Sequence, residues 1–190
     1  MNAVRAIAAA IPVVLLSACA LVSPGPSRLP ATAFDMVGRV LVSGEGRAFS
    51  SGLRWKHDVT ADELWLMSPV GQTLAHIAAD NTGALLTTSD QQEYRAFSVE
   101  SLTRRALGWA LPLAELRFWV MAAPVPGEPA AVVTRDAAGR ITVLEQNNWR
   151  VSYAYPDAPG PAALPRRLDL NRGEQHIRLV IDVWRSGDTP

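Results

Sequence analysis

Apolar and polar residues alternate with a period of two along most of the chain after residue 33. The alternation is clearest at residues 34–42, 49–55, 73–79 and 149–155. Successive side chains point to opposite faces of a strand, so this period predicts half-buried β-strands. The last such segment is the most regular. Trp184 is expected on one of its faces, and the other face carries Ile177, Leu179, Ile181 and Val183.

Shorter apolar segments add to the predicted strand count. They cover residues 64–67, 83–88, 93–96, 132–134, 141–146 and 164–170. Residues that favour turns separate them, and most of the connections are short, which favours antiparallel neighbours.

One stretch in the middle of the chain is helical in period. Ser98 is a suitable N-cap, apolar residues follow about one or two turns apart, and Gly108 ends the segment. Pro112 suits the first turn of a second helix, whose apolar face is formed by Leu113, Leu116, Trp119 and Val120. Pro124, Pro126 and Pro129 then prevent its continuation.

The expected fold is therefore mainly β with inserted helices. An antiparallel sheet of about eleven strands curls, and an incompletely closed barrel needs something across its opening. The helical pair is the natural plug of this unclosed antiparallel β-barrel. Apolar side chains inside such a barrel form either a packed core or an apolar cavity for lipid, and periodicity fits both.

The N-terminus has the plan of an export signal. Arg5 precedes an apolar run, which leads to Leu16, Ser17, Ala18 and Cys19. A membrane anchor or a buried helix is less consistent with this short run and the prolines that follow. The tetrad resembles the lipobox of bacterial lipoproteins, which implies that residues 1–18 are removed and Cys19 is acylated. Ala20, rather than Asp, after the cysteine implies by the same resemblance the outer membrane. Residues 19–33 read as a lipidated N-terminus and flexible tether.

Composition restricts the remaining possibilities. The 190 residues suit one domain, expected at 34–186 with a short tail at 187–190, and the single cysteine excludes an internal disulfide. Eighteen basic and eighteen acidic residues without a basic block argue against nucleic-acid binding. His57, His76 and His176 lack ligand-like spacing, and no nucleotide loop or catalytic motif occurs. We therefore expect neither an enzyme nor a cofactor or metal site.

Several motifs together resemble the LolB family of outer-membrane lipoproteins, over about residues 34–184. They are Gly38-Arg39-Val40, Trp55, Leu64-x-Leu66-x-Ser68-Pro69-Val70-Gly71, Gly108-Trp109-x-Leu111-Pro112-Leu113, Leu116, Trp119, Gln146-Asn147-Asn148-Trp149, Tyr153, Leu164-Pro165 and Ile177-Arg178-Leu179 to Trp184. The chain departs from the family in two places. The segment before Phe34 is short and rich in proline where better-known members have a helix, and Val70 stands where a leucine is usual.

The resemblance implies a receptor that takes lipoproteins from a LolA-like periplasmic carrier and inserts them into the inner leaflet of the outer membrane. Its partners would be that carrier, lipoprotein acyl chains and outer-membrane phospholipid, and we expect a lipid-anchored monomer facing the periplasm. A related carrier without insertase activity and an envelope scaffold with a filled core are the alternatives. Candidate residues for an acyl-chain cavity are Phe49, Leu53, Trp55, Leu64, Leu66, Trp119 and Trp149.

The loop at residues 68–71 is the other candidate site. Pro69 favours the second position of a β-turn and Gly71 the fourth, which leaves Val70 at the tip. An apolar tip residue either folds back onto the barrel or faces outward, and the turn geometry fits both. The resemblance implies that Pro69, Val70 and Gly71 form an outward loop that helps cargo to enter the membrane.

Overall fold

The computed structural model describes residues 32–44, 46–130, 132–157 and 163–185. The predicted signal peptide, Cys19, most of the tether and the tail at 187–190 lie outside the described residues. Eleven strands are present: β1 (Phe34–Gly44), β2 (Arg47–His57), β3 (Ala61–Met67), β4 (Thr73–Asp80), β5 (Gly83–Thr88), β6 (Glu93–Ala96), β7 (Val132–Arg135), β8 (Ile141–Gln146), β9 (Trp149–Ala154), β10 (Arg167–Arg172) and β11 (Gln175–Arg185).

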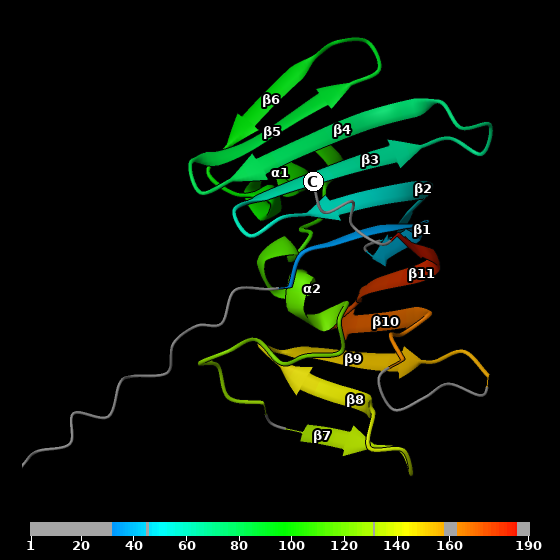
Figure 1. Cartoon of the computed structure of the whole chain (residues 1–190). Helices are drawn as coiled ribbons and strands as arrows, with labels where there is room; N and C mark the ends of the chain where they lie inside the picture. Colours follow the sequence, from blue (N-terminus) through cyan, green and yellow to red (C-terminus); the bar gives the residue numbers. More distant parts are fainter. Residues whose placement is uncertain (1–31, 45, 131, 158–162, 186–190) are drawn as a thin grey trace, which may run out of the picture.

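All eleven strands form one antiparallel sheet, as the period-two alternation predicts. Their order is β6-β5-β4-β3-β2-β1-β11-β10-β9-β8-β7, which Figure 1 shows from top to bottom. Every pair of neighbouring strands except β1–β11 is also consecutive in the sequence, so short turns make most of the connections. Strands β6 and β7 are the two edges and do not pair with each other, so the barrel is unclosed.

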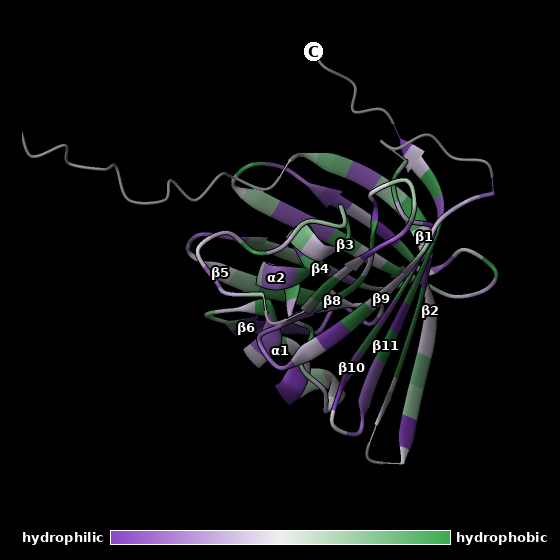
Figure 2. Ribbon diagram, turned by 90° about the horizontal axis from the view of Figure 1, so that it is seen from below, coloured by the Kyte–Doolittle hydropathy of each residue, from purple (hydrophilic) through white to green (hydrophobic). Residues whose placement is uncertain are grey.

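The two helices connect one edge of the sheet to the other. Helix α1 (Val99–Leu107) begins after Ser98, whose Oγ accepts a hydrogen bond from the backbone N–H of Ser101, and it ends at Gly108 with a φ of 82°. Helix α2 (Leu113–Trp119) follows Pro112. Both lie within the curve of the sheet (Figure 2), so the two predicted helices are confirmed; α2 is shorter than predicted, because Pro112 and Val120 are its caps.

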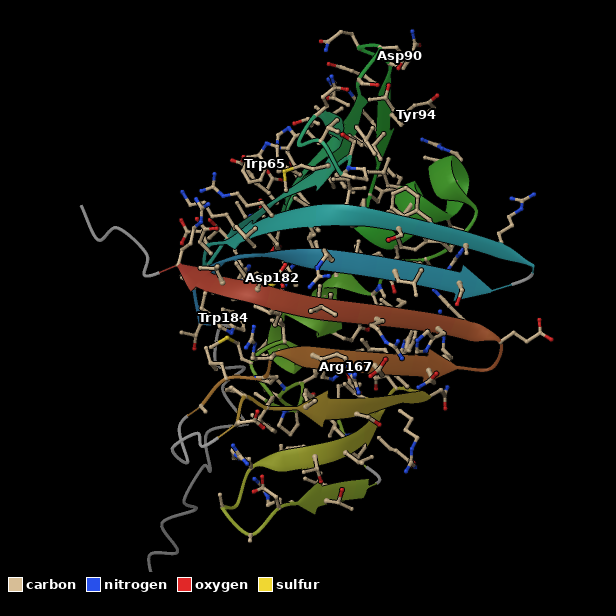
Figure 3. All side chains as sticks on the ribbon, turned by 90° about the vertical axis from the view of Figure 1, so that its right-hand side faces the viewer. Trp65, Asp90, Tyr94, Arg167, Asp182 and Trp184 are labelled. Atoms are coloured by element: carbon tan, nitrogen blue, oxygen red, sulfur yellow. The ribbon has the colours of Figure 1, made fainter. Side chains whose placement is uncertain are left out.

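The core lies between the inner face of the sheet and the helices. Alternate residues of β1, β2 and β3 are buried, including Met36 and Trp55 at 0% exposure, as the period predicts. The opposite face is polar and carries cross-strand ion pairs. One joins Arg39 to Asp182 at 2.9 Å, and Asp182 is visible on the outer face with Arg167 in Figure 3.

The end of β11 differs from the prediction. Val183 is 51% exposed, although the alternation places it with the buried Ile181, and Trp184 packs against the core. The cause is a bulge: Val37 pairs with Val183 but Gly38 pairs with Ile181, so Asp182 is the extra residue. One extra residue exchanges the two faces of a strand from that point on. Trp184 thereby meets Phe34, with ring centroids 5.8 Å apart.

Candidate functional site

The apolar interior contains a cavity of only about 20 Å³. Four predicted residues line it from the sheet: Leu53, Trp55, Leu64 and Leu66. The other lining residues were not predicted for it. They are Val40, Ile77, Ile177 and Leu179 on strands, and Trp109, Leu111 and Leu116 on the helical segment.

The helical segment closes this interior. Trp109 and Leu111 lie between the two helices, and Leu116 lies on α2, so all three side chains face the buried strand residues. The remaining space is near that of one water molecule, whereas pockets for drug-sized ligands measure about 300–1,000 Å³. The interior therefore has no room for an acyl chain in this conformation.

Three predicted cavity residues lie elsewhere. Phe49 is on the part of β2 beyond the interior, where its ring lies 6.3 Å from that of Trp109. Trp119 and Trp149 belong to the packed core, with ring centroids 6.3 Å apart and an interplanar angle of 61°. The guanidinium group of Arg172 covers Trp149 at 4.4 Å.

Buried polar groups hold α2 against the sheet. The carboxylate of Asp62, 2% exposed, accepts hydrogen bonds from Trp55 Nε1 at 2.8 Å and from Arg117 Nη2 of α2 at 2.9 Å, and its Oδ1 lies 2.8 Å from His57 Nδ1. The buried amide of Gln146 binds the last residue of α2, because its Oε1 accepts a hydrogen bond from Trp119 Nε1 at 3.1 Å.

The segments that flank α2 are fixed in the same way. Gln146 also accepts from the backbone N–H of Val125 at 2.8 Å and donates to the carbonyls of Val125 and Glu128. Before α2, Gln175 Nε2 donates to the carbonyl of Ala110 at 2.9 Å. The plug is therefore attached by a few directed hydrogen bonds and by apolar packing, and not by a continuous backbone ladder.

The predicted turn at residues 68–71 is present. The backbone N–H of Gly71 donates to the carbonyl of Ser68 at 2.9 Å, and Ser68 N–H donates to Gln72 at 2.8 Å. The structure places Val70 outward, with 81% of its surface exposed, and the neighbouring Leu74 is 39% exposed. The part of the β3–β4 hairpin nearest this turn, residues 64–79, contains no Asp, Glu, Lys or Arg.

Burial affects one titratable group of the interior strongly. Burial raises the pKa of the Tyr153 hydroxyl well above its ordinary value, so this group stays neutral. Within the described residues, no group of three or more His, Cys, Asp or Glu side chains could hold a metal ion. Neither described helix is long and apolar enough to cross a membrane.

The architecture is similar to that of a solved structure. A LolA superfamily protein from Nitrosomonas europaea superposes with a TM-score of 0.52 over 86% of this chain and 90% of its own. The two sequences are 8% identical, so the likeness concerns the fold alone. The protein thus has the fold of the LolA superfamily.

The sequence itself identifies the family. The family model of the outer membrane lipoprotein LolB matches residues 32–184. The outer-membrane lipoprotein LolB of Azoarcus sp. (strain BH72) is 41% identical over 90% of this chain and 89% of its own length. Those of Nitrosomonas europaea and Thiobacillus denitrificans are 40% and 39% identical, over 82% and 90% of this chain and 76% and 92% of theirs. The chain belongs to the LolB family.

Proposed function

We propose that this protein accepts lipoproteins from a LolA-like periplasmic carrier and inserts them into the inner leaflet of the outer membrane. Membership of the LolB family and the similarity to a LolA superfamily fold support the class of function. The exposure of Val70 is the observation that carries the insertion step. A tip residue that is 81% exposed, within residues 64–79 that include no Asp, Glu, Lys or Arg, can enter hydrocarbon at little cost.

The interior would hold the acyl chains of the cargo during transfer. Each methylene withdrawn from water contributes about 0.8 kcal/mol, so a carrier must cover the chains and still release them to a bilayer. A surface formed by Leu53, Trp55, Leu64 and Leu66 offers contact without polar anchors. The closed interior then represents the empty state, and displacement of Trp109, Leu111 and Leu116 would open it.

Anchoring would follow from the N-terminal sequence. We propose that residues 1–18 are removed, that Cys19 carries the lipid and that residues up to 33 connect it to β1. About fifteen residues reach on the order of 50 Å when extended, which lets the domain turn Val70 toward the membrane. The protein would then lie on the periplasmic side of the outer membrane as a monomer.

The insertion step is tested by Val70→Glu in the lipidated protein, with Val70→Leu as the matched apolar variant. The assay follows transfer of a labelled lipoprotein from its carrier to liposomes. A carboxylate resists entry into hydrocarbon, so Val70→Glu should accept cargo and fail to insert it. Val70→Leu should insert at least as well as the wild type, because it adds apolar surface.

Circular dichroism on both variants separates insertion from folding. A Val70→Glu protein that inserts normally contradicts the role of the tip. Acceptance without insertion by the wild type would identify a carrier instead. Native mass spectrometry tests the interior, and a protein that never retains an acyl ligand would be a scaffold with a filled core.

A further inference from the structure

A second and larger cavity, of about 950 Å³, opens at the end of the plug. Its walls are the β1–β2 hairpin end, the β10–β11 turn, the end of α1 and the residues that follow it. Figure 2 shows both turns reaching past α1 at the lower edge of the molecule. Three arginines line this space, Arg47, Arg104 and Arg172, and we call it the arginine cleft.

Positive charge dominates the arginine cleft. Glu174 is the only acidic residue among the described residues that line it. Arg47 and Arg104 are exposed and form no ion pair with a described carboxylate. Arg172 donates to Gln175 Oε1 at 3.2 Å and stacks on Trp149. The guanidinium of Arg47 reaches α1, since its Nη1 is 3.0 Å from where a Cβ on Gly108 would lie.

Acidic groups behind the cleft moderate this charge without cancelling it. Burial first and the neighbouring Glu115 second raise the pKa of Glu100, while Arg104 and Arg172 lower it. The two arginines therefore lie close enough to Glu100 to interact, but neither forms an ion pair with it. Their guanidinium groups keep donors for an external anion.

The inner wall of the cleft is aromatic. Phe49 and Trp109 lie side by side, with ring centroids 6.3 Å apart, between the arginines and the apolar interior. Trp109 also lines the 20 Å³ cavity. A molecule in the cleft would therefore meet cations at the mouth and apolar surface deeper in, which is the polarity of an anionic amphiphile.

We propose that the arginine cleft binds the phosphate headgroup of an anionic phospholipid, with the first part of its acyl chain against Phe49 and Trp109. Arginine pairs well with phosphate oxygens, and basic residues near a lipid surface favour anionic headgroups. A concave cleft of this volume with an apolar wall fits a lipid better than an acidic protein surface, which needs neither feature. The site does not depend on Val70 or on insertion.

The test uses the full chain with Cys19→Ala, so that an anchor does not determine membrane affinity. Lysophosphatidylglycerol and lysophosphatidylcholine of equal chain length are titrated below their micelle concentrations, by calorimetry and tryptophan emission. The anionic lipid should bind about tenfold more tightly. Arg47→Gln with Arg104→Gln should remove that preference and leave the choline lipid unchanged.

The matched control is Arg105→Gln with Arg135→Gln, which removes the same charge. Both residues are exposed outside the cleft. Among the described residues, Arg105 donates to the backbone carbonyl of Arg95 and Arg135 to that of Gly139, and neither pairs with a carboxylate. The control should keep the anionic preference. The proposal would be overturned if the two double variants lost the anionic preference to the same extent. It would also be overturned if the wild type bound the two lipids equally well.

Two competitors identify the source of the anion. Inorganic phosphate at the same concentration as the lipid should not displace lysophosphatidylglycerol, because phosphate has no acyl chain. Displacement would indicate a site for free phosphate instead. A hexaglutamate peptide should also fail to displace it. If the peptide displaced the lipid, the proposed lipid site would be wrong and the cleft would instead bind an acidic protein segment.

Discussion

At the scale of single residues, Gly38 marks a point where two strands approach too closely for a side chain. A Cβ at this position would lie 2.0 Å from the carbonyl oxygen of Val180 on β11. The contact is with backbone, which cannot rotate away. The β11 bulge is opposite, because the register with β1 shifts between Val37 and Gly38. A single glycine thus permits the bulge that turns Trp184 toward the core.

We expect Gly38→Ala to lower the free energy of unfolding by about 2 kcal/mol or more, because the two strands must separate to admit a methyl group. Chemical denaturation followed by tryptophan fluorescence measures it. Gly52→Ala is the matched control on β2. Its Cβ would meet Met67 Cβ at an ordinary 3.4 Å, so its stability should change by less than about 0.5 kcal/mol. Equal losses in the two variants would show that the close approach at Gly38 is not the cause.

At the scale of elements, local patterns were sufficient to predict the strands and both helices. Alternation is a property of a few adjacent residues, and the cap at Ser98 and the stop at Gly108 are equally local. The orientation of Val183 and Trp184 depended on a bulge against β1, which involves residues far apart in the sequence. Such a feature leaves no trace in the alternation of one strand.

The candidate site was predictable only in part, for the same reason. Leu53, Trp55, Leu64 and Leu66 share the inner face of two paired strands, and strand parity identifies them. Trp119 and Trp149 are equally apolar, but their place depends on where α2 crosses the sheet. Trp109 lies between the helices, outside any periodic pattern. An apolar residue directly after a helix-ending glycine was the available signal.

Helix α2 depends on Arg117 for its attachment to β3. We expect Arg117→Met to lower the free energy of unfolding by about 1–3 kcal/mol, because the buried Asp62 carboxylate loses its cation. The hydrogen bond from Trp55 to Asp62 remains and limits the loss. Backbone amides of α2 should exchange hydrogen faster, which mass spectrometry of peptides covering residues 113–119 measures. The methionine preserves most of the side-chain volume, so the change tests the charged contact.

Arg150→Met provides the control on the sheet. Arg150 pairs with Glu145 across two adjacent strands, and their side chains are 57% and 32% exposed. Exposed ion pairs contribute little, so this variant should leave exchange in α2 and overall stability nearly unchanged. If Arg150→Met accelerates exchange in α2 as much as Arg117→Met does, the Asp62 contact does not hold the helix.

At the scale of the whole molecule, the sheet and the plug have different kinds of attachment. Ten antiparallel strand pairings hold the sheet together, from β6 to β7. The plug is held by apolar contacts and by the directed hydrogen bonds of Asp62, Gln146 and Gln175. Opening of the interior therefore requires loss of a few contacts while the sheet stays intact. This division suits a protein that must take up and release a chain without unfolding.

Anchoring is a property of the whole molecule that rests on one side chain. If Cys19 carries the acyl chains, Cys19→Ala should yield a protein that folds but leaves the membrane fraction, because no other predicted segment anchors it. Labelling of cells with a radioactive fatty acid should mark the wild type and Ser23→Ala, which lies outside the lipobox, and leave Cys19→Ala unlabelled. Circular dichroism should give the same spectrum for all three proteins, since the sheet begins at Phe34. Label on the alanine variant would place the lipid on another residue and refute the lipobox.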